Sequence, residues 1–124
     1  MLAWLVADPE RLSRTAASAI RRARLSDGLA IADITAWELA CLFARGILRA
    51  HNTVENAVQN VLARSGVVVK PITAEIAAIA AQFSDDYPRD PADRLIGATA
   101  MAEGLALVTR DERIREFVRL KTIW

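Results

Sequence analysis

Apolar side chains follow two patterns along the chain, and each pattern predicts a different kind of element. Helical spacing of apolar positions, together with capping residues, predicts helices. These helices cover residues 2–7, 11–24, 35–46, 53–65, 73–83, 90–104 and 111–117. Short continuous apolar runs predict strands at 29–32, 67–69, 105–109 and 120–124. Strands that alternate with helices predict an α/β fold with a mostly parallel sheet and helices on both faces.

Two helix starts carry recognisable capping signals. Thr35 and Glu38 have the spacing of a capping box, and Asp90-Pro91 combines an N-cap with a first-turn proline. Gly104 stands at the position that commonly ends a helix. These signals set the expected limits of the two helices that carry most of the candidate chemistry.

Composition narrows the class of protein. A chain of 124 residues that is 53% hydrophobic and 25% charged forms a single packed domain, residues 1–124, rather than a disordered chain. A net charge of +1 is too balanced for a surface that binds nucleic acid all over. The single Cys41 and single His51 exclude an internal disulfide and the usual zinc sites. The apolar opening is far shorter than the roughly 20 residues that span a bilayer, so we expect a cytoplasmic protein without a membrane partner.

Three acids lie at the expected ends of strands or in the first turns of helices, namely Glu38, Asp93 and Asp111. In a parallel α/β sheet, the carboxyl ends of strands and the first turns of the following helices gather along one edge, where ligands bind. Carboxylates brought together there repel one another unless a hard cation such as Mg²⁺ or Mn²⁺ neutralises them. The same acids also fit as helix caps, and the pattern alone leaves both interpretations open.

Two blocks of sequence resemble a known family. Residues 90–100 (DPADRLIGATA) and 104–114 (GLALVTRDERI) are similar to the C-terminal half of PIN-domain ribonucleases, especially the VapC-type toxins of bacterial toxin–antitoxin pairs. Residues 34–40 (ITAWELA) resemble the helix that carries the second acid of that family. The resemblance implies a three-layer α/β sandwich and a Mg²⁺- or Mn²⁺-dependent endoribonuclease that acts on single-stranded RNA.

The resemblance also implies roles for individual residues. Glu38, Asp93 and Asp111 match the family's second, third and fourth acids, which are catalytic and bind the metal. Thr109 matches the hydroxyl beside the fourth acid, and Asp90 matches the helix cap of the motif.

Arginines and tryptophans supply the remaining candidates. Arg94 and Arg110 each stand beside one of the acids, where they contact RNA phosphates bidentately or pair with the neighbouring acid. The tryptophans, Trp37 among them, are expected in the core or at an interface rather than under RNA bases.

The family's first acid has no counterpart. It ends a first strand that would lie immediately before Met1, so we expect that the sequence begins too late and that the chain as given is inactive or nearly so. Asp33 is a better stand-in for that acid than Asp8, which matches a later turn of the family. A catalytically inactive PIN scaffold that only binds a partner is the alternative.

The resemblance implies a small VapB-like antitoxin as the partner, besides the RNA substrate. A peptide of the antitoxin would place an Arg or Lys among the acids in competition with the metal. We also expect a homodimer, because Trp4, Phe43 and Trp124 exceed what a small core readily hides.

Overall fold

The computed structural model describes residues 2, 5 and 8–124. Leu2 and Leu5 have helical backbone, and the remainder of the helix expected at 2–7, including Trp4, lies outside the described residues. Within these ranges, no helix is long and apolar enough to cross a bilayer.

The helices follow the expected order. They are the short η1 (Pro9–Arg11), then α2 (Arg14–Leu25), α3 (Asp33–Ala44), α4 (Val54–Ser65), α5 (Ala74–Ala81), α6 (Pro91–Glu103) and α7 (Glu112–Arg115). Five of them begin at a side chain that accepts a backbone N–H from the first turn, namely Ser13, Thr53, Thr73, Asp90 and Asp111. Such caps satisfy N–H groups that have no partner within the helix.

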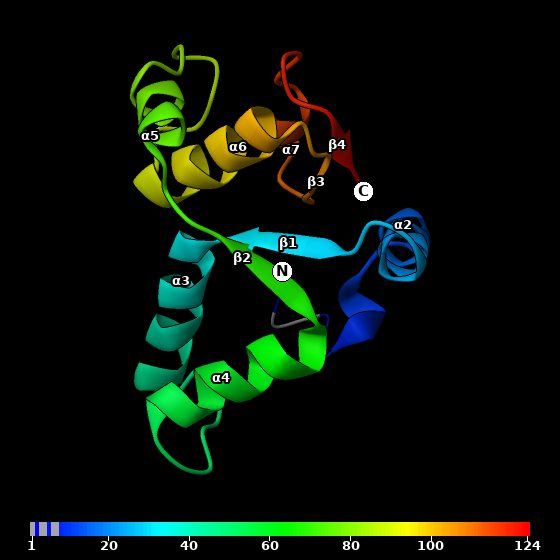
Figure 1. The fold of residues 1–124 in the computed structure, drawn as a ribbon, viewed down its shortest axis with the longest axis vertical. Coiled ribbons are helices and arrows are strands. Elements are labelled where there is room, and N and C mark those ends of the chain that lie inside the picture. The colour runs from blue at the N-terminus through cyan, green and yellow to red at the C-terminus, as the bar shows by residue number, and fades with distance from the viewer. Residues whose placement is uncertain (1, 3–4, 6–7) are drawn as a thin grey trace.

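The strands are parallel, as expected, and form two separate ladders. β1 (Leu29–Ala32) pairs with β2 (Val67–Lys70), and β3 (Leu107–Val108) pairs with β4 (Thr122–Ile123). Figure 1 shows β1 and β2 between the α3–α4 pair and the α5–α6 pair, with α2 beside them. The α/β class with parallel strands is therefore confirmed, although β3 and β4 are shorter than the runs expected at 105–109 and 120–124.

The start of α3 corrects the capping box expected at Thr35 and Glu38. The helix begins at Asp33, directly after β1, and its N-cap residue Ala32 makes no side-chain cap bond. Asp33 Oδ2 instead accepts the N–H of Ile72 at 3.2 Å, which ties the start of α3 to the segment after β2. Glu38 consequently lies in the second turn, where it cannot serve as a capping acid.

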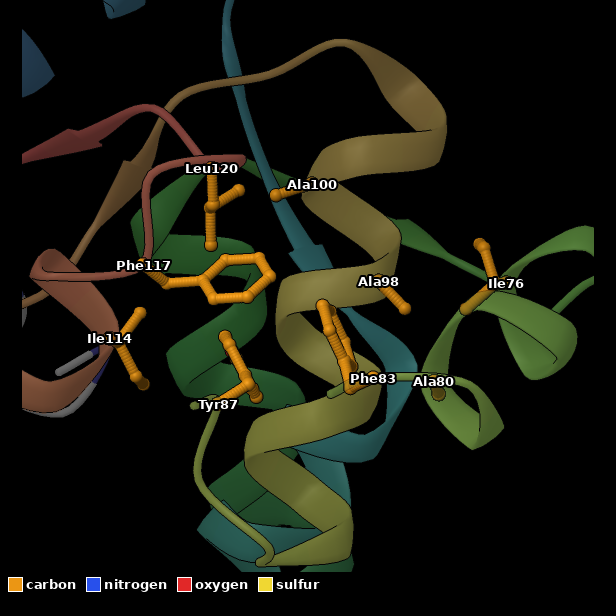
Figure 2. Close-up of a cluster of buried hydrophobic side chains, with 9 residues drawn as sticks. All are labelled: Ile76, Ala80, Phe83, Tyr87, Ala98, Ala100, Ile114, Phe117 and Leu120. Carbon is orange, nitrogen blue, oxygen red and sulfur yellow. The ribbon is translucent and has the colours of Figure 1, made fainter. Parts of the chain in front are cut away.

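The main core cluster lies in the C-terminal part of the chain. It joins α5 and α6 to α7 and to the segment that follows α7, as Figure 2 shows. The ring of Tyr87 stacks on Phe83 at 4.1 Å between centroids and meets Phe117 edge-on at 5.1 Å. Tyr87 is fully buried, although the sequence predicts only a polar loop at 84–89. This loop therefore supplies a central core residue immediately before α6.

Candidate functional site

The three acids come from three different helices. Glu38 lies in the second turn of α3, Asp93 in the first turn of α6, and Asp111 is the N-cap of α7. Helices α3 and α6 pack against each other, which brings the first two acids into the same region. The packing of α3 on α6 is consistent with the prediction that Glu38 and Asp93 lie together.

The pKa values of two of these acids show that they share one negative region. Burial raises the pKa of Glu38, and the nearby charges of Asp93 and Asp90 raise it further. Burial likewise raises the pKa of Asp93, with added repulsion from Asp90 and Asp111 and an opposing effect of Arg113. Asp93 is therefore close enough to Asp90, Asp111 and Glu38 for their charges to affect one another.

The acids match a hard divalent cation in kind, since carboxylate oxygens are the ligands that Mg²⁺ and Mn²⁺ prefer. Their mutual repulsion is also what a bound cation would relieve. In the part of the chain that the structure describes, however, no three His, Cys, Asp or Glu side chains are grouped closely enough to hold a metal ion. The donor chemistry fits a metal, whereas the distances in this structure do not assemble a complete site.

Two acids of the region are also helix caps. Asp90 Oδ1 accepts the N–H of Asp93 at 3.0 Å, which confirms the cap predicted for it. Asp111 Oδ1 accepts the N–H of Arg113 at 2.9 Å and that of Ile114 at 3.3 Å. Asp111 therefore has the capping role that the sequence left open, and a catalytic role would have to be additional.

Thr109 lies beside Asp111, as the resemblance implied. Its side chain is buried, and its Oγ1 accepts the N–H of Asp111 at 3.2 Å. The hydroxyl thus fixes the backbone of the acid rather than meeting its carboxylate.

Arg94 makes contacts that the sequence did not predict. Its Nε donates to the carbonyl of Pro88 at 3.0 Å and its Nη1 to the carbonyl of Phe83 at 3.3 Å. The guanidinium therefore holds the loop before α6, a role different from pairing with the neighbouring acid. RNA contact by Arg94 or by the exposed Arg110 stays a prediction.

Two residues of this region were missed by sequence reasoning. Tyr87 donates its hydroxyl to the carbonyl oxygen of Asp93 at 2.8 Å. Its position was signalled only by a lone aromatic residue in a polar segment just before the Asp90 cap. Arg113 lowers the pKa of Asp93, although it stands in a basic stretch that reads as a solvated face. Its closeness in sequence to Asp111 was the available signal.

Two other expectations concern Asp33 and Trp37. Asp33 Oδ2 accepts the N–H of Ile72, and its role as a stand-in for the family's first acid stays a prediction. Trp37 is 61% exposed, which excludes the core position expected for it and leaves an interface as the prediction.

Comparison with known proteins identifies the family of this fold. Residues 1–120 match the PIN domain family, and the chain belongs to it. It is similar to ribonuclease VapC22 of Mycobacterium tuberculosis (strain ATCC 25618 / H37Rv), with 39% identity over 123 residues, 98% of this chain and 91% of the relative. The resemblance to VapC-type PIN-domain proteins is thereby confirmed.

Proposed function

We propose that the chain is a Mg²⁺- or Mn²⁺-dependent endoribonuclease that cleaves single-stranded RNA. Glu38, Asp93 and Asp111 are its catalytic acids and would hold the metal, with Thr109 and Asp90 supporting their backbone. The bound metal would supply an activated water and offset negative charge on the phosphate. Arg94 and Arg110 contact the phosphates of the RNA.

One observation carries this proposal: burial and the charges of nearby carboxylates raise the pKa values of Glu38 and Asp93. Like charges held together in a partly buried place destabilise a fold, and such arrangements are concentrated at functional sites. Membership of the PIN family and the similarity to a protein named as a ribonuclease add support for RNA cleavage.

Cleavage of a labelled single-stranded RNA by the purified chain, with Mn²⁺ or Mg²⁺ present and then removed by EDTA, tests the proposal. The same assay tests the expectation from the sequence that the chain as given is inactive or nearly so. We expect Glu38→Gln, Asp93→Asn and Asp111→Asn each to lower the rate by more than about 100-fold. Mutation of a residue that only hydrogen-bonds to a metal ligand typically lowers activity by about 10–100-fold, and loss of a ligand itself should lower it further. Asp85→Asn is the matched control, since Asp85 is exposed and forms a surface ion pair with the nearby Arg89. Undiminished cleavage in all three variants would show that the acids are only structural.

A catalytically inactive PIN scaffold is the second candidate. It is favoured by the lack of any three grouped acidic, His or Cys side chains among residues 2, 5 and 8–124. Metal-dependent cleavage by the wild-type chain, lost in Asp93→Asn, excludes this candidate, whereas a chain that binds its partner and never cleaves RNA supports it.

We also propose a VapB-like antitoxin as the protein partner. A basic side chain of the antitoxin placed among Glu38, Asp93 and Asp111 would relieve the same repulsion as a cation. Binding of the antitoxin should therefore weaken as Mn²⁺ is raised, which a binding titration at several Mn²⁺ concentrations measures. Affinity that is independent of Mn²⁺ would place the antitoxin elsewhere.

A homodimer is proposed from exposed apolar surface. Trp37 is 61% exposed and Val68 is 58% exposed, and a dimer interface would cover apolar side chains of this kind. Light scattering at micromolar concentration should give the mass of two chains. A mass of one chain would remove the dimer and leave the nuclease proposal untouched.

A further inference from the structure

We propose that Tyr87 is a positioning residue, whose hydroxyl holds the first turn of α6 so that Asp93 is presented to Glu38 and Asp111. The inference rests on the proposed function, because Tyr87 would act on the reaction only through Asp93. It assigns a role to a side chain that the catalytic proposal does not use.

The first argument is the pair of hydrogen bonds at Asp93. Tyr87 donates to its carbonyl oxygen at 2.8 Å, and Asp90 Oδ1 accepts its N–H at 3.0 Å. Both backbone polar groups of Asp93 are therefore held by side chains that lie before α6. The first turn of a helix is otherwise the part most free to open, because its N–H groups lack partners within the helix.

The second argument is how firmly the hydroxyl itself is placed. The ring of Tyr87 is fully buried. It stacks on Phe83 and meets Phe117 edge-on, and Figure 2 shows the three rings gathered together. On the helix side it lies flush against Gly97, where an added Cβ would meet Tyr87 Cζ at 2.7 Å and the hydroxyl oxygen closer still. These contacts restrict rotation of the Tyr87 side chain, so its hydroxyl is held in position to donate to Asp93.

The third argument is that the loop carrying Tyr87 is itself fastened to α6. Arg94, the residue after Asp93, donates to the carbonyls of Phe83 and Pro88. Tyr87 binds the helix from the loop, and Arg94 binds the loop from the helix. These contacts join the loop and the first turn of α6 into one rigid unit around Asp93.

The test compares two variants that each remove one buried hydroxyl that donates to a backbone carbonyl of α6. Tyr87→Phe keeps the ring and removes the bond to Asp93. Thr99→Val is the matched control, because Thr99 Oγ1 donates to the carbonyl of Leu95 at 2.7 Å, on the same helix and away from Asp93. The full chain is titrated directly with Mn²⁺ without RNA, the amide exchange of the first turn of α6 is measured, and kcat and KM for RNA cleavage are determined.

We expect Tyr87→Phe to weaken Mn²⁺ binding by about tenfold and to lower kcat by about tenfold, with KM for RNA unchanged. Amides of the first turn of α6 should exchange faster in this variant alone. Thr99→Val should keep the wild-type Mn²⁺ affinity and kcat to within about twofold.

The positioning role would be overturned if Tyr87→Phe kept the Mn²⁺ affinity and the amide exchange of the wild type. It would also be overturned if Thr99→Val lost as much Mn²⁺ affinity and kcat as Tyr87→Phe. A wild-type chain that neither binds Mn²⁺ nor cleaves RNA would instead overturn the proposed function. Amide exchange in the first turn of α6 then decides by itself whether Tyr87 holds Asp93.

Discussion

Glu38 carries a charge that the fold does not favour. Burial and the charges of Asp93 and Asp90 raise its pKa above the ordinary value of 4.5. The folded protein therefore binds a proton at Glu38 more tightly than the unfolded chain does. The contribution of Glu38 to stability falls as the pH rises from its ordinary pKa through its raised pKa. Above the raised pKa, the charged side chain destabilises the fold by the full amount.

Glu38→Gln should therefore stabilise the protein at neutral pH, because it removes the charge that burial and the neighbouring acids disfavour. The gain should vanish in acid, below both pKa values, because the wild-type side chain is then neutral as well. Urea denaturation at several pH values, with EDTA present, measures this difference. Equal stability of both proteins at every pH would mean that neither burial nor the neighbouring carboxylates disfavour the charge of Glu38 in solution.

Gly97 lies inside α6 and leaves room for the side chain of Tyr87. Glycine inside a helix lowers stability by about 1 kcal/mol relative to alanine, so Gly97→Ala would stabilise an unobstructed helix. Here the added methyl group would meet Tyr87, which Phe83 and Phe117 hold in place. The clash should prevail, with a net loss of about 1–3 kcal/mol.

A double-mutant cycle locates the cause of that loss. In a Tyr87→Phe background the nearest atom is gone, so Gly97→Ala should destabilise less than it does in the wild type. Chemical denaturation of the four proteins gives the coupling energy. An equal loss in both backgrounds would show that the hydroxyl is not the obstacle.

At the level of elements, the cap of α7 and the proposed catalysis share one residue. Asp111 accepts two N–H groups at the start of this short helix. Asparagine caps helices about as well as aspartate, whereas alanine gives up about 1 kcal/mol. Asp111→Asn should keep the stability of the wild type, and Asp111→Ala should lose about 1 kcal/mol, while both lose RNA cleavage. Matching losses of stability in the two variants would mean that α7 depends on the charge and not on the hydrogen bonds.

Element types were readable from the sequence where the signal is local. The caps at Thr53, Thr73 and Asp90 lie where the sequence placed them, because a side chain and an N–H a few residues on suffice to make them. The start of α3 was mispredicted, because the strand before it leads straight into Asp33, and a contact with Ile72 from a distant segment holds that residue. Long-range contacts of this kind leave no spacing pattern in the sequence.

The same limit applies to the candidate site. The acids were predicted to lie together because parallel topology sends strand ends to one edge. Helices α3 and α6, which carry two of them, do pack together. Tyr87 and the contacts of Arg94 were missed, because both depend on how the loop at 84–89 folds back onto α6. Sequence therefore identified the charged groups of the region, whereas the structure was needed to find what holds them.

For the whole molecule, the distribution of buried side chains predicts uneven stability. Helices α4 and α6 have similar lengths, 12 and 13 residues, but they differ in burial. The sequence gives α4 a clear apolar face, yet in the structure its only buried residue is Ser65. Helix α6 buries a full turn, Gly97 to Ala100, and Ala98 and Ala100 of that turn belong to the main core cluster.

Amide exchange should consequently be slower in α6 than in α4, since slow exchange follows burial in the core. We expect protection at the centre of α6 to exceed that at the centre of α4 by about tenfold or more, which corresponds to roughly 1.4 kcal/mol. Exchange followed by NMR under native conditions gives both values in one sample, so the solvent is the same for both helices. The two helices also have nearly the same length. Equal protection would mean that the half-buried face of α4 is covered in solution, as in the proposed homodimer. Repeating the measurement at a concentration where light scattering shows one chain separates that cause from the fold of the single chain.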